Sequence, residues 1–220
     1  MNEIALLTLA HLLALVYWLG ADLGVFYSSF VLCDDRKSPE VRVSAAKILF
    51  ALDQAPRICM TLMLPLGVHL AVLTGFQRLP SWAVAVTWGI GLAWLGMVLA
   101  LHFLGHGRDL RILTRVDFWF RALLVVALLA YGALAIAGES GTATPWAGKK
   151  LVVFALLVAC GLAVRIRLKP FAPAFANLVR GTPSREDNAA IRRSIGGTRP
   201  FVVAIWVGLL VNSALGVHLI

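Results

Sequence analysis

Six apolar segments dominate this chain, and each is long enough to cross the hydrocarbon core of a bilayer as an α-helix, which needs about 20 residues. They lie at 4–33, 57–77, 82–106, 117–137, 149–168 and 200–220. Hydrophobic residues make up 60% of the 220 residues and charged residues only 14%, which is too apolar for an ordinary water-soluble domain. The sequence therefore predicts an all-α fold: a polytopic bundle of six transmembrane helices that forms one transmembrane domain over residues 1–220.

The basic residues are distributed unevenly between the two sides of such a bundle. The loops and helix ends after the first, third and fifth segments hold five, four and eight Lys and Arg, 17 of the 20 in the chain. The opposite side holds only Arg78, Lys149 and Lys150. By the positive-inside rule, we expect a multi-pass protein of a bacterial-type inner membrane with both termini extracytoplasmic. The net charge of +9 is thus interpreted as a topology signal and not as a nucleic-acid surface.

The first segment also contains Asp22 and lacks a basic start, so we do not expect a cleavable signal peptide.

Two of the basic loops carry signals for short helices at the membrane interface. Apolar residues recur at helical spacing within 34–56, and Pro56 fits the first turn of the second span. In 169–199, Ser184 stands three residues before Asp187, as in a helix-capping pair. Prolines 170, 173 and 183 are expected to interrupt this loop, and Gly196-Gly197 to end its helix. Small residues at four-residue spacing in the first and last spans (Gly20, Gly24, Gly208, Asn212, Gly216) predict close helix contacts, either within the chain or in a homo-oligomer.

The first span carries a polar stripe on one helical face, formed by His11, Trp18, Asp22 and Ser29. Asp22 lies about 16 Å from the basic end of this helix, since each residue adds about 1.5 Å. A carboxyl group at that depth must be protonated or paired, with Arg57 or Thr61 as candidate partners. Asp22 is therefore our candidate catalytic residue, as a proton carrier, and the alternative is a buried structural hydrogen bond.

Two histidines are predicted at similar depth on consecutive, antiparallel helices. His11 lies about 10 Å and His69 about 12 Å below the extracytoplasmic helix ends. Two imidazoles can ligate a heme iron from opposite faces within a helical bundle. We therefore expect His11 and His69 as heme b ligands, with Trp18 nearby and Arg78, Lys149 and Lys150 available for the propionates. The alternative is that each histidine makes its own hydrogen bond.

A second histidine pair has the spacing of a metal chelate. His102 and His106 share a helical face at the end of the third span, an arrangement in which two imidazoles can hold one metal ion. The alternative is a pair of solvated interfacial histidines. Asp117 lies four residues before Arg121, which predicts a local ion pair, and His218 is expected in solvent near the terminus.

Two groups of residues match the pattern of a known family. The first is His11, Trp18, Gly20 and Tyr27 in the first helix, and the second is Trp146 and Lys149. In these residues the chain resembles the HemJ-type protoporphyrinogen oxidases and the CopD-like integral membrane proteins. The resemblance implies a heme-binding helical bundle in which His11 ligates the iron.

The leading prediction is a heme b-binding membrane redox protein, and a membrane-bound oxidoreductase is one form of it. It would pass electrons to a membrane or redox partner, or oxidise a quinone or porphyrin-like hydrophobic substrate in the lipid phase. One alternative is a metal or small-solute transporter that uses Asp22 and the histidines along its path. Another is a non-catalytic membrane subunit or assembly factor.

Overall fold

The computed structural model describes residues 2–104 and 108–219, and all of its regular secondary structure in that part of the chain is helical. The helices are α1 (Glu3–Cys33), α2 (Pro39–Leu52), α3 (Gln54–Leu73), α4 (Ser81–Phe103), α5 (Arg108–Ile136), α6 (Pro145–Arg167), α7 (Phe171–Val179), α8 (Arg185–Gly196) and α9 (Arg199–Gly216). Six of the described segments are long and apolar enough to cross a membrane. The predicted all-α bundle with six spans is therefore confirmed.

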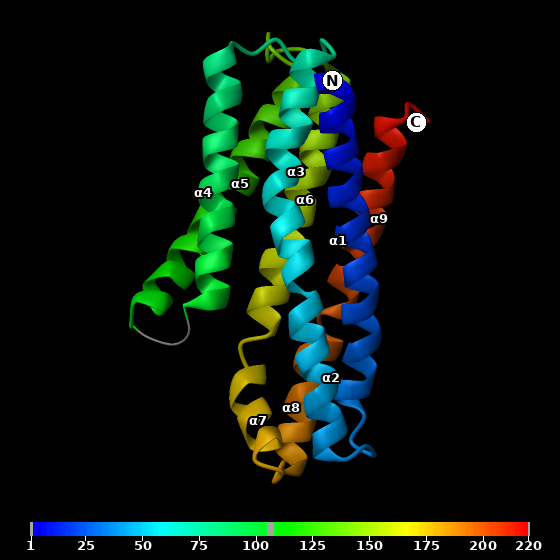
Figure 1. Cartoon of the computed structure of the whole chain (residues 1–220), viewed down its shortest axis with the longest axis vertical. Helices are drawn as coiled ribbons and strands as arrows, with labels where there is room; N and C mark the ends of the chain where they lie inside the picture. The colour runs from blue at the N-terminus through cyan, green and yellow to red at the C-terminus, as the bar shows by residue number, and fades with distance from the viewer. Residues whose placement is uncertain (1, 105–107, 220) are drawn as a thin grey trace.

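The spans form a central group with a helix pair beside it (Figure 1). Helix α1 packs on α3 and α9, α6 packs on α9 and α5, and α4 packs on α3 and α5. In Figure 1 both termini lie at the same end of the bundle, and α2, α7 and α8 lie at the other. We call these the termini end and the basic end. The buried core between the spans includes Trp18, Met63, Trp94, Phe154 and Leu209.

The short helices at the basic end form a cap with a core of its own. Leu32, Leu49, Leu178 and Ile191 are among the buried residues of this second cluster. Helix α8 begins with a capping box, in which the Ser184 hydroxyl accepts from the backbone of Asp187 and the Asp187 carboxylate accepts from the backbone of Ser184. Helix α2 and the capped start of α8 are as predicted, whereas α7 was not expected from the sequence. One expectation was wrong: Pro173 does not interrupt the loop, because it lies in the first turn of α7, where its missing N–H costs no helical hydrogen bond.

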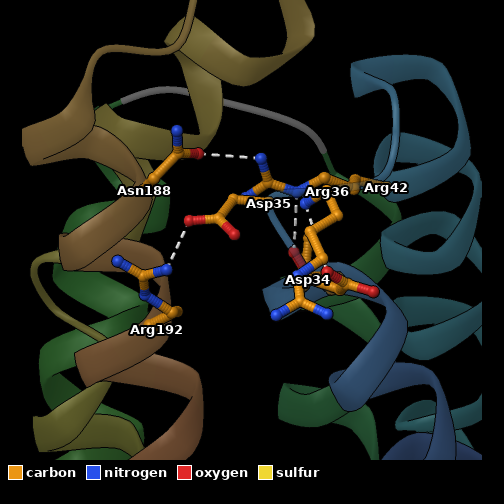
Figure 2. A network of polar contacts seen from close by, with 7 residues as sticks. Asp34, Asp35, Arg36, Arg42, Asn188 and Arg192 are labelled. Atoms are coloured by element: carbon orange, nitrogen blue, oxygen red, sulfur yellow. Dashed lines mark hydrogen bonds and ion pairs between the residues drawn. The ribbon is translucent and has the colours of Figure 1, made fainter.

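A polar network ties the cap to α1 (Figure 2). Arg42 of α2 is 2% exposed and donates to the backbone oxygen of Leu32 at 2.9 Å and to Asn188 Oδ1 at 2.7 Å. Arg192 of α8 forms an ion pair with Asp35, and the Asp34 carboxylate accepts from the backbone of Arg36. Arg42 thus satisfies a carbonyl at the C-terminus of α1 and joins three helices.

Glycines mark the closest helix contacts. A Cβ on Gly148 of α6 would lie 2.7 Å from the Gly132 carbonyl of α5, and a Cβ on Gly208 would lie 2.5 Å from Leu157. A Cβ on Gly24 would collide with Leu52, whereas a Cβ on Gly20 would meet no other side chain or helix within 4 Å. The small residues predicted to mediate close packing therefore do so within the chain at Gly24 and Gly208, but not at Gly20.

Candidate functional site

Two cavities lie one beyond the other within the central helices. The larger, of about 470 Å³, is at the termini end between α1, α3, α6 and α9. We call it the histidine cavity; its lining includes His11, Trp18, Phe76, Trp146, Lys150 and Leu157. The smaller, of about 200 Å³, is nearer the basic end. We call it the arginine cavity; its lining includes Trp18, Asp22, Arg57, Arg121, Arg165 and Arg199. Trp18 and Leu157 line both and separate the two.

The polar stripe of α1 faces the bundle interior, as its spacing predicts. Trp18, Asp22 and Ser29 are 3%, 7% and 5% exposed and line the arginine cavity. His11, two turns before Trp18, lines the histidine cavity. One helical face therefore presents an imidazole to one cavity and a carboxyl group to the other.

His11 makes no hydrogen bond among the described residues. Its ring packs against α3, where a Cβ on Gly67 would lie 3.3 Å from Cε1, and its Nδ1 is buried without a partner. A buried ring nitrogen without a partner is uncommon, because no hydrogen bond offsets the free energy lost when the nitrogen leaves water. Gly67, which the sequence analysis did not single out, provides the space for this ring.

His69 has different surroundings from His11. Its Nδ1 accepts from Trp88 Nε1 of α4 at 3.3 Å, and its Nε2 lies 3.6 Å from a carboxylate oxygen of Glu3. His69 is absent from the lining of the histidine cavity. The expected similar depth fits the structure, since His11 lies beside Gly67, two residues before His69. The two imidazoles do not, however, face one cavity.

Of the three cations at the termini end, Lys150 alone lines the histidine cavity. Its Nζ donates to the Asn212 carbonyl at 2.7 Å and lies 5.3 Å from the centre of the Trp146 ring. Arg78 and Lys149 are exposed outside this lining. His218, expected in solvent, is exposed but also stacks on Trp146 at 5.2 Å and contributes to the lining.

Neither expected partner of Asp22 contacts it. Arg57 forms an ion pair with Asp53 one turn earlier, and the Thr61 hydroxyl donates to the Ile58 carbonyl at 2.8 Å. In the described part of the chain, Asp22 has no ion pair. Its carboxyl group therefore lies in the arginine cavity without the charge partner that the sequence suggested.

The predicted pair of Asp117 and Arg121 is confirmed, and a third residue joins it. Asp117 is fully buried, and its carboxylate accepts from Arg121 Nε at 3.0 Å and from Arg165 Nη1 at 2.5 Å. The Arg121 guanidinium also lies 5.3 Å from the centre of the Trp94 ring. Sequence reasoning counted Arg165 and Arg199 only as topology signals, because residues on different spans show their convergence only in the folded bundle.

The second histidine pair is not brought into a metal site by the described residues. His102 lies exposed in the last turn of α4, and His106 lies outside the described part of the chain. No group of three His, Cys, Asp or Glu side chains that could hold a metal ion occurs among the residues described.

No protein-family model, curated protein sequence or solved structure matches this chain. Its function is therefore inferred from its own residues and their geometry.

Proposed function

We propose that this protein is a heme b-binding membrane redox protein, in which the histidine cavity would hold the heme and the His11 imidazole would bind its iron. The observation that carries the proposal is the His11 imidazole, which has no hydrogen-bond partner among the residues that the structure describes and lines a cavity of about 470 Å³. Ligand pockets commonly enclose about 300–1,000 Å³ and combine apolar walls with a few polar groups.

The rest of the lining fits the same ligand. Trp146 and Phe76 supply aromatic surface, and Lys150 supplies a cation at the end of the cavity nearest the chain termini. A heme has a flat apolar ring with two carboxylates at one edge, so it requires both kinds of surface and an imidazole for its iron. The likeness of the first helix to the HemJ-type oxidases supports the same assignment of His11. When bound, the group would supply one-electron chemistry, while this chain holds and orients it.

The orientation of the protein in the membrane belongs to the same proposal. The basic end carries 17 of the 20 Lys and Arg, which supports a cytoplasmic position for α2, α7 and α8 and an inner-membrane location. The histidine cavity would then lie in the extracytoplasmic half of the bilayer. Electron transfer to a partner, or oxidation of a quinone or porphyrin-like substrate, would take place there.

The heme content of purified variants tests this proposal. His11→Ala should lose most of the heme, because it removes the imidazole that would bind the iron, and free imidazole should restore part of it. His69→Ala is the matched control and should retain the heme, since His69 contacts Trp88 and Glu3 instead. Loss of heme from His69→Ala alone would overturn the assignment to His11. A colourless wild-type protein that does not bind added hemin would overturn the function itself and leave a transporter or a non-catalytic subunit or assembly factor.

One observation favours transport as a second candidate function. The two cavities meet at Trp18 and Leu157, and Asp22 lies immediately beyond this barrier. A proton or small solute that crossed it would pass both titratable groups of the α1 stripe. Trp18→Ala, which removes the largest part of the barrier, should then raise proton flux into proteoliposomes. An unchanged flux would exclude this route.

A further inference from the structure

The arginine cavity holds more positive than negative charge. Among the described residues, Asp53 pairs with Arg57, and Asp117 is shared between Arg121 and Arg165. Arg199 has no carboxylate partner there: it donates to the Ser29 hydroxyl at 3.2 Å and to the Ser29 carbonyl at 3.3 Å. Its guanidinium lies 3.8 Å from the centre of the Phe30 ring. Four arginines thus face two paired carboxylates, and Asp22 can offset one further charge.

These arginines lie at the level where the spans end. Arg57 is in the first turn of α3, Arg165 in the last turn of α6, and Arg199 is the first residue of α9. The Arg57 and Arg165 side chains are 47% and 30% exposed, so a ligand can reach them from outside the bundle. An uncompensated cluster of positive charge at a membrane boundary attracts anions from the adjacent headgroup region and solution.

The chemistry of the cluster favours a phosphate group. A guanidinium is planar and permanently charged, and it presents paired N–H donors that match two phosphate oxygens. The cavity volume of about 200 Å³ is below the usual range for whole drug-sized ligands. It therefore suits a small anionic head, while any attached chain would extend outside.

We propose that the arginine cavity is a phosphate-binding site, which takes either the headgroup of an anionic phospholipid or a free phosphate ion. Arg199 would provide the main contact, and Arg57 and Arg165 would contribute through the donors that Asp53 and Asp117 leave free. This site is distinct from the histidine cavity, so it goes beyond the heme proposal and does not depend on it. His11→Ala should leave phosphate binding unchanged.

Two probes test the site on the full-length protein. In detergent, inorganic phosphate at constant ionic strength should raise the melting temperature of the wild type saturably. In nanodiscs, native mass spectrometry should detect retained phosphatidylglycerol in preference to phosphatidylcholine. Binding of phosphate without lipid retention assigns a soluble ligand, and lipid retention without a phosphate effect assigns a headgroup. Either result supports the site, and neither probe binding would overturn it.

Substitutions of individual arginines test whether phosphate binds in the arginine cavity. Arg199→Gln and Arg57→Gln should each weaken binding about ten- to a hundredfold, as expected for the loss of a charge-assisted hydrogen bond. Arg193→Gln is the control, because Arg193 is exposed on α8 and the change removes the same charge from the same end. Arg199→Lys, which retains the charge but not the paired donors, should bind phosphate more tightly than Arg199→Gln and so separates the effect of charge from that of folding. Equal losses in Arg193→Gln, or undiminished binding in both cavity variants, would refute the proposal.

Discussion

Replacing Asp117 by Asn should destabilise the bundle more than any other loss of an ion pair in the described structure. The carboxylate is fully buried, and it holds Arg121, whose side chain is 11% exposed, and Arg165, whose side chain is 30% exposed. Removing one partner of a buried pair leaves an uncompensated charge and costs about 3–5 kcal/mol. We expect the lower part of this range, about 3 kcal/mol, because Arg165 can regain contact with water.

Asp35→Asn provides the matched control. It removes a carboxylate from an ion pair with Arg192 in which the two side chains are 39% and 50% exposed. Exposed pairs contribute only about 0–1 kcal/mol. The difference between the two variants thus measures the effect of burial, because the chemical change is the same.

The free energy of unfolding should be measured by steric trapping in bicelles. A loss of about 3 kcal/mol corresponds to a more than hundredfold increase in the unfolded fraction. Adding Arg121→Gln to Asp117→Asn should recover part of the stability, since it removes the stranded charge. The reasoning is refuted if Asp117→Asn and Asp35→Asn have the same effect.

Three further predictions concern topology, helix packing and Asp22. A periplasmic reporter fused after Ile220 should be active and a cytoplasmic one inactive, because both termini lie at the end poor in Lys and Arg; the opposite result would invert the bundle. Gly148→Ala should lower the melting temperature, because its Cβ would lie 2.7 Å from the Gly132 carbonyl, whereas Gly20→Ala should leave it unchanged or raise it, since no atom lies within 4 Å. Equal melting temperatures would show that α5 and α6 can separate without cost. Asp22→Asn should preserve folding and heme content but abolish turnover or proton flux, because an amide does not titrate and cannot carry a proton. Full activity of this variant would show that Asp22 has only a structural role.

The residue pattern was sufficient to predict those parts of the fold that depend only on residues close together in the sequence. The spans follow from the lengths of the apolar segments, and the start of α8 follows from Ser184 and Asp187. The buried face of α1 follows from helical periodicity, which places Trp18, Asp22 and Ser29 on one side. The pair of Asp117 and Arg121 is likewise within one helix, so its spacing alone predicted it.

The contacts between side chains of different helices could be identified only from the tertiary structure. The position of a residue along a helix sets its level in the bundle, so residue numbers were sufficient to place His11 and His69 at a similar level. Which way each side chain points depends on how the helices rotate against one another as they pack. In this bundle α3 turns Gly67 toward His11, and His69, about 200° further around the helix, faces Trp88. The same packing brings Arg165 to Asp117 and gathers four arginines around one cavity. The sequence by itself thus determined the spans, the caps and the polar face of α1, because these depend on neighbours along the chain. Tertiary packing alone decided which side chains share a cavity.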